Sequence, residues 1–111
     1  MQTETVEKKT MQSIVPAVNI LETPVSYIVS LDIPGAAKES IKANIENNTL
    51  IVAATIAENL ETANIEGRYY REFSLGGDID VQTVDAQYNL GVLTVTLNKK
   101  LQYLPKQIQI K

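Results

Sequence analysis

Apolar side chains recur at every second position along most of the chain, which is the period of a β-strand with one face on a core. The clearest run consists of Val25, Tyr27, Val29, Leu31 and Ile33. Pro34 and Gly35 follow this run and end it, because proline interrupts strand pairing and glycine frees the backbone to turn. The pattern therefore predicts a strand over residues 25–33.

Further groups with the same period predict more strands. They lie at residues 18–20, 41–45, 69–75, 84–90 and 92–97. Residues 49–55 are almost entirely apolar, which predicts a strand that is covered on both faces or lies beside a partner. Asn47–Asn48 and Gly76–Gly77 are typical of turns between such strands, and the polar residues 56–67 are interpreted as a long connection. Six or seven short strands with no convincing amphipathic helix predict an all-β, immunoglobulin-like sandwich of two antiparallel sheets.

The chain of 111 residues suits one domain with short extensions. Residues 1–15 are polar and unpatterned, and we interpret them as a short flexible N-terminal arm with a weak apolar patch at Met11, Ile14 and Val15. Residues 16–98 are predicted to form the sandwich. Residues 99–111 are predicted to be a C-terminal tail.

The amino-acid composition excludes several kinds of catalytic and binding site. The chain has no histidine, which removes the commonest general acid or base and the usual partner of a nucleophile, and no cysteine, which excludes disulfides and thiolate metal sites. The net charge is −3 with no run of Lys or Arg, so nucleic acid is not an expected partner. No apolar run approaches the length of a membrane span, and the start lacks a secretory pattern. We expect a cytoplasmic protein without cofactor, metal site or membrane partner.

The tail carries an unusual apolar pair. In an extended segment residues i and i+2 project to the same side, so Ile108 and Ile110 form one apolar face while Gln109 and Lys111 point the other way. Such a pair near a terminus is either a frayed end or a ligand for a groove.

Four motifs in order resemble those of the small heat shock protein family (the Hsp20 or α-crystallin domain family). The opening Leu31-Asp32-Ile33-Pro34-Gly35 is similar to the start of its domain, and Arg71-Glu72-Phe73-Ser74-Leu75 to its R-x-F-x-L strand. Ala86 followed by Gly91-Val92-Leu93 is similar to its A-x-x-x-n-G-V-L signature, and Pro105 to Ile110 to its I-x-I tail. The resemblance covers about residues 16–111. The chain departs from the family in having Gly76 where Pro is usual and Leu90 where Asn is usual.

The resemblance implies two kinds of contact between subunits. The pair Ile108 and Ile110 would dock between two strands of its own or a neighbouring subunit, and the candidate groove residues are Ile41, Ala43, Ile45, Val84, Ala86 and Tyr88. A homodimer would form either by exchange of a brief strand near residues 64–65 or edge to edge along residues 68–75. The candidate dimer residues are Arg71, Tyr69, Phe73 and Ile65.

The function implied is that of an ATP-independent holdase chaperone, which binds partly unfolded proteins and slows their aggregation. Met11, Ile14 and Val15 are the candidate client contacts. The alternative is a p23-like co-chaperone or another interaction module with little holdase activity. An enzyme is the third possibility. Its best support is a set of acidic residues that could bind a cation, Asp78, Asp80 and Asp85, but acidic residues in loops usually remain solvated.

Overall fold

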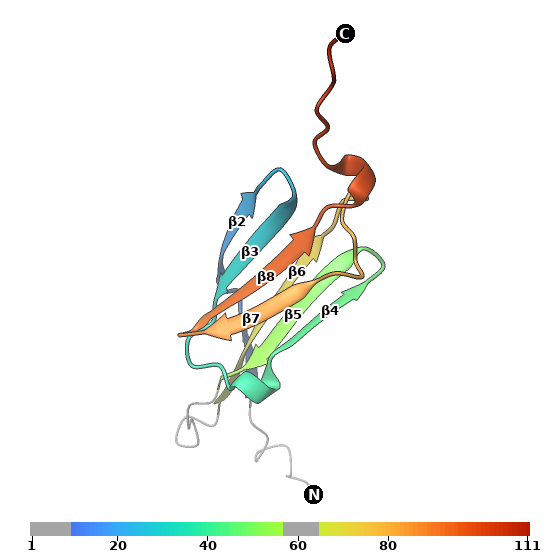
Figure 1. Ribbon diagram of the computed structural model, residues 1–111. Coiled ribbons are helices and arrows are strands. Elements are labelled where there is room, and N and C mark those ends of the chain that lie inside the picture. Colours follow the sequence, from blue (N-terminus) through green and yellow to red (C-terminus); the bar gives the residue numbers. More distant parts are fainter. Residues whose placement is uncertain (1–9, 57–64) are drawn as a thin grey trace, which may run out of the picture.

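Two four-stranded sheets face each other in the computed structural model, which describes residues 10–56 and 65–111 (Figure 1). One sheet has the order β1 (Thr10–Ile14), β6 (Ile65–Ser74), β5 (Thr49–Thr55), β4 (Lys42–Glu46). The other has the order β2 (Ala17–Glu22), β3 (Ser26–Asp32), β8 (Val92–Asn98), β7 (Asp85–Asn89). Two short 3-10 helices, η2 (Lys38–Ser40) and η3 (Leu101–Tyr103), complete the described elements. The predicted all-β sandwich is confirmed.

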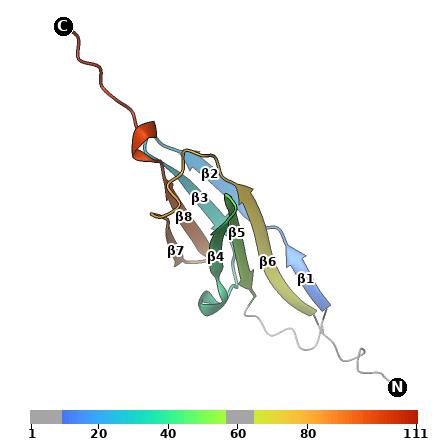
Figure 2. The same cartoon turned by 90° about the vertical axis from the view of Figure 1, so that its right-hand side faces the viewer.

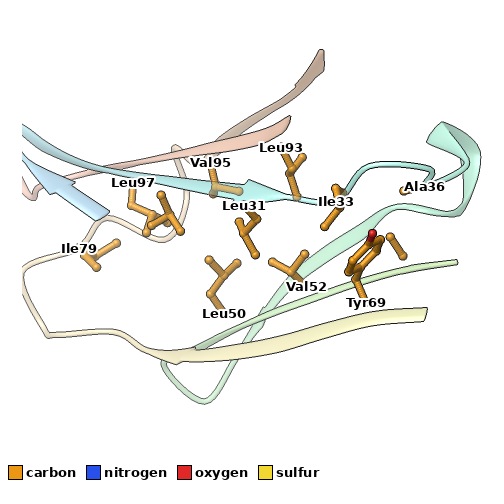
Figure 3. Close-up of a cluster of buried hydrophobic side chains, with 12 residues drawn as sticks. Leu31, Ile33, Ala36, Leu50, Val52, Tyr69, Ile79, Leu93, Val95 and Leu97 are labelled. Carbon is orange, nitrogen blue, oxygen red and sulfur yellow. The ribbon is translucent and has the colours of Figure 1, made fainter. Parts of the chain in front are cut away.

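The core lies between the sheets and uses one residue in two from each central strand. Along β5 and along β8 the buried positions alternate with partly exposed ones, as a strand with one face on the core requires. The largest fully buried side chains are Leu31, Ile33, Leu50, Leu97, Val52 and Val95. Figure 3 shows these side chains pointing toward one another from both sheets. Burial of these apolar surfaces is the main force that holds the two sheets together.

Two hairpins turn through left-handed backbone. Asn47 and Asn48 have φ of 51° and 58° between β4 and β5, which confirms the predicted turn, since Asn tolerates this conformation. Leu90 and Gly91 have φ of 51° and 82° between β7 and β8. The prediction that Leu90 continues the apolar face of its strand is wrong: Leu90 is a turn residue and is 92% exposed.

The first strand corrects two further expectations. Residues 10–14 of the expected flexible arm form β1, which pairs with β6 in parallel from Thr10↔Ile65 to Ile14↔Tyr69. The first sheet is therefore not purely antiparallel, although its other pairings are. The connection expected over residues 56–67 is shorter, because β6 begins at Ile65. Residues 57–64 of that connection, and residues 1–9, lie outside the described part of the chain.

The borders of the sandwich position the candidate site. β4 is the last strand of one sheet and β7 the last strand of the other, and Figure 2 shows the two side by side at one border. β1 and β2 are the outermost strands at the opposite border. Outermost strands present unpaired backbone groups, which makes each border a place where another extended segment can add.

Candidate functional site

A groove runs between β4 and β7, and we call it the β4–β7 groove. It consists of two adjoining hollows of about 360 Å³ and 290 Å³. The first is lined by Ala43, Asn44, Ile45, Leu50, Val81, Val84 and Ala86. The second is lined by Lys38, Ile41, Ala43, Ala86, Tyr88 and Leu93. Most lining residues are apolar by type, but polar atoms form about as much of the exposed wall as apolar atoms do, so the groove can receive apolar side chains and polar backbone groups together from the open border.

All six groove residues expected from the sequence line these hollows. The pairing explains why. Ala43 lies opposite the buried Val52, and Ala86 lies opposite the buried Val95, so both alanines face between the sheets, and residues two positions away do the same. Ala43 and Ala86 line both hollows, so the groove continues from one hollow to the other past these two small side chains. That a tail docks here stays a prediction.

Sequence reasoning missed several groove residues. Leu50 and Leu93 are core residues, 1% and 3% exposed, that also form part of the groove wall. Val81 lies in a polar connection and is 45% exposed. An isolated apolar residue between Asp80 and Gln82 was the available signal, but nothing in the local pattern relates this connection to β4.

The C-terminal tail leaves the sandwich after η3, and both views show it continuing away from the sheets (Figures 1 and 2). Ile108 is 82% exposed and Ile110 is 92% exposed. Within residues 10–56 and 65–111, the apolar pair therefore occupies no groove of its own chain. Pro105 restricts the backbone only at the start of this segment.

The four candidate dimer residues lie on β6 but have different surroundings. Tyr69 is 8% exposed, belongs to the core, and donates a hydrogen bond to the carbonyl of Pro34 at 2.7 Å. Its position does not favour a subunit contact. Arg71 lies with its guanidinium 5.2 Å from the ring centre of Phe73, and its Nη1 donates to the carbonyl of Pro16 at 3.5 Å. Ile65 is the first residue of β6, and its side chain lies outside the described part.

The candidate client residues lie on or beside β1. Ile14 is 37% exposed and Val15 is 69% exposed, so both present apolar surface to solvent. Met11 is a residue of β1 whose side chain lies outside the described part. β1 also occupies the outer edge of β6 from Ile65 to Tyr69, which leaves that edge open only beyond Tyr69 among the described residues.

At the end of the sandwich where the tail begins, four polar side chains meet. The Tyr27 hydroxyl donates to Asp78 Oδ2 at 2.6 Å. Lys99 Nζ donates to Glu22 Oε2 at 2.8 Å and lies 5.0 Å from the ring centre of Tyr27. The hydrogen bond to Asp78 is the main cause that raises the pKa of Tyr27 to about 12, with desolvation next, because both favour the neutral phenol. We call Glu22, Tyr27, Asp78 and Lys99 the tail anchor.

The acidic residues considered for a cation do not gather into a site. Within residues 10–56 and 65–111, no three side chains among His, Cys, Asp and Glu lie together as a metal site would need. Asp78 instead accepts from Tyr27, and Asp80 Oδ1 accepts from the backbone N–H of Gln82 at 3.0 Å. Among the described residues, no helix has the length and apolar character needed to cross a bilayer.

The sequence of this chain is similar to those of known proteins. The sequence profile described as the Hsp20/alpha crystallin family matches residues 19–111. Small heat shock protein C2 of Rickettsia felis is 29% identical over 110 residues, which covers 92% of this chain and 71% of that protein. The 16.9 kDa class I heat shock protein 1 of Triticum aestivum is 34% identical over 87 residues, which covers 70% of this chain and 58% of that protein. The chain thus spans little more than half of the wheat protein.

Solved structures share the sandwich. A small heat-shock protein from Xylella fastidiosa superposes with a TM-score of 0.73 at 23% identity, covering 88% of this chain and 97% of that one. Heat shock protein 16.0 from Schizosaccharomyces pombe gives a TM-score of 0.72 at 23% identity, covering 89% and 77%. At these identities the likeness shows the fold.

Proposed function

Because the chain belongs to the Hsp20/alpha crystallin family of small heat shock proteins, we propose that it is an ATP-independent holdase chaperone. Members of this family are chaperones rather than enzymes. In the proposed mechanism the protein captures partly unfolded polypeptides on apolar surface and slows their aggregation. The chain assembles through dimers and through docking of its C-terminal tail.

One observation supports the assembly proposal: the chain has both the apolar tail and a groove that could receive it, and in the described part of the chain the two do not contact each other. Ile108 and Ile110 are both largely exposed on the tail. The β4–β7 groove is lined mainly by apolar residue types with polar atoms among them, and it lies between two outermost strands. A tail that adds along β4 or β7 would satisfy unpaired backbone groups while its isoleucines enter the hollows. The groove of a second copy is the proposed receptor.

The energetics suit a reversible contact. Burial of two isoleucine side chains contributes about 3–5 kcal/mol at about 25 cal/mol per Å². Immobilising the tail side chains and a second copy of the chain opposes much of this gain. The tail is therefore expected to dock and release, and release would open the β4–β7 groove to clients.

The test compares Ile108→Ala/Ile110→Ala with the matched control Gln107→Ala/Gln109→Ala, which alters the opposite side of the same segment. Native mass spectrometry reports assembly, and light scattering from a thermally unfolding client reports holdase activity. We expect the isoleucine variant to lose mass toward the dimer and to change in activity, while the glutamine variant matches the wild type. Equal mass and equal activity in all three proteins would exclude the tail from the mechanism.

The same assay separates the alternative function. A p23-like co-chaperone or another interaction module would form a dimer of one mass and leave client aggregation unchanged at every protein concentration. A holdase suppresses aggregation without nucleotide. The clients proposed are partly unfolded proteins, with Met11, Ile14 and Val15 as contacts, and a cytoplasmic location stays a prediction.

The dimer contact is proposed to use an exchanged segment rather than the edge of β6. β1 holds the outer edge of β6 from Ile65 to Tyr69, so edge-to-edge pairing along residues 68–75 would require β1 to detach in part. The outer edge of β2 carries no partner strand within the described part of the chain. A strand donated by the connection near residues 64–65 of a second copy would find that edge free, at the cost of the pairing between Thr10 and Ile65 alone.

A further inference from the structure

The base of the C-terminal tail is tied to the sandwich from two directions. The backbone N–H of Lys99 donates to the carbonyl of Val25 at 2.9 Å, which fixes it to the residue that precedes β3. The backbone N–H of Lys100 donates to the carbonyl of Asp78 at 2.7 Å, which fixes it to the connection after β6. The tail therefore begins between a sheet and a connection, and its direction depends on how firmly these two supports are joined.

The tail anchor joins them. The Asp78 carboxylate accepts from Tyr27 of β3, while the carbonyl of the same residue holds Lys100. The Lys99 ammonium reaches Glu22 of β2 and lies over the Tyr27 ring. The Lys99 side chain is 11% exposed, so it is confined, whereas Glu22 is 60% exposed. An ion pair this exposed on one side adds little stability, and its effect is mainly on orientation.

Gly76 belongs to the same arrangement. A Cβ at this position would lie 2.9 Å from Asp78 Oδ1, so a larger residue would push the carboxylate away from Tyr27. The sequence has glycine here where proline was expected, and the Asp78 contact gives a physical reason for that departure. This end of the sandwich thus combines a confined lysine, a carboxylate that bridges two segments, and a glycine that leaves room for the carboxylate.

We propose that the tail anchor is a positioning device: Glu22, Tyr27, Asp78 and Lys99 fix the direction in which residues 104–111 leave the sandwich, and so the angle at which the tail reaches a second copy. This inference rests on the proposed tail docking for its consequence in assembly. The direction itself does not depend on docking. A fixed direction allows one assembly geometry, and a freely pivoting tail allows several.

The direct test measures tail direction without docking. The chain has no cysteine, so spin labels at Asp32→Cys on β3 and Gln107→Cys on the tail report one intramolecular distance. Labelled protein is diluted with unlabelled protein, in the Ile108→Ala/Ile110→Ala background that removes docking. Three backgrounds are compared: the native anchor, Lys99→Met/Tyr27→Phe, and Lys100→Met as the matched loss of one exposed lysine at the next residue.

We expect a narrow distance distribution for the native anchor and for Lys100→Met. A segment of about nine residues without a fixed direction has a root-mean-square extent of about 16 Å, so the anchor variant should give a distribution roughly twice as wide. Lys99→Arg alone, which keeps the charge at this position, should retain the narrow distance distribution. Equal widths in all backgrounds would overturn the proposal. Tyr27→Phe alone keeps the packed ring and serves if the double variant unfolds.

Native mass spectra of the same anchor variants with intact isoleucines give the second readout. One defined mass for the native anchor and a spread of masses for Lys99→Met/Tyr27→Phe would support positioning in the assembly. One defined mass for both, with a wider label distribution in the variant, would overturn that consequence. If loss of the isoleucines leaves the mass unchanged, tail docking fails, while the label widths still decide the anchor.

Discussion

Ala43 of β4 and Ala86 of β7 both line both hollows of the β4–β7 groove. Each side chain ends at Cβ, and each lies on the outermost strand of its sheet. The width of the groove at this point therefore depends on two small residues. Neither belongs to the buried core, so a larger side chain there fills the groove with little effect on the sandwich.

Ala86→Leu is expected to close the groove and lower the assembly to the mass of the Ile108→Ala/Ile110→Ala variant. The physical reason is occupation of the space that the tail isoleucines would fill. Native mass spectrometry checks the prediction, and the melting temperature should stay within about 2 °C of the wild type, as is usual for a surface substitution in a small domain.

Gln87→Leu is the matched control, because residue 87 pairs with Thr94 and faces away from the groove. It adds the same side chain one position along the same strand. We expect it to keep the wild-type mass. A loss of mass with Gln87→Leu, or none with Ala86→Leu, would contradict docking in this groove.

Leu90→Asn should stabilise the domain by about 1 kcal/mol. Leu90 has φ of 51° and is 92% exposed, so it carries the strain of left-handed backbone and gains no burial in return. Asparagine adopts this conformation at lower cost. Chemical denaturation measures the free energy of unfolding, with Leu90→Ala as the control for loss of the side chain alone. A stabilisation by alanine equal to that by asparagine would point away from backbone strain.

The Tyr27 phenol should give the domain a stability that disappears at high pH. Its pKa is raised from 10.0 to about 12, mainly by its hydrogen bond to Asp78. Because the folded value exceeds the unfolded value, the contribution is complete below pH 10 and is lost as the pH rises toward 12. Denaturant unfolding of the wild type and Tyr27→Phe at pH 9 and above should show the difference between them shrinking. A constant difference would show that the phenol proton is not involved.

Ile14→Ser/Val15→Ser is expected to weaken holdase activity about twofold without changing the assembly mass, because these residues present apolar surface beside the sandwich. Ser13→Ala, on the same strand, should leave activity unchanged. Aggregation of a heated client at equal protein concentration is the measurement. An unchanged activity in the double serine variant would remove this segment from the proposed client surface.

The strands were predictable because each central strand buries every second residue. The alternating pattern alone identifies the buried face at Val29, Leu31, Val95 and Leu97. The left-handed turn at Asn47–Asn48 was predictable from the residue type. The groove residues were predictable as a set through the family resemblance. Which face they occupied depended on the register of β4 against β5 and of β7 against β8.

The remaining features depended on contacts between distant segments. The residues of β1 show no alternation, and this strand forms only because β6 offers an unpaired edge. Val81 reaches the groove through the path of a polar connection. The tail anchor joins residues that are 51 and 77 positions apart, and no local pattern signals such pairs. Leu90 was misplaced because its apolar character matched the strand period while Gly91 required a turn.

The central claim is that this chain holds partly unfolded proteins without nucleotide. The most direct measurement is light scattering from a thermally unfolding client, heated with increasing amounts of the full chain and no ATP. The account predicts that scattering falls with protein concentration and that client and chaperone elute together afterwards. Unchanged scattering at a molar excess of the chain, with the chain itself still folded, would contradict it.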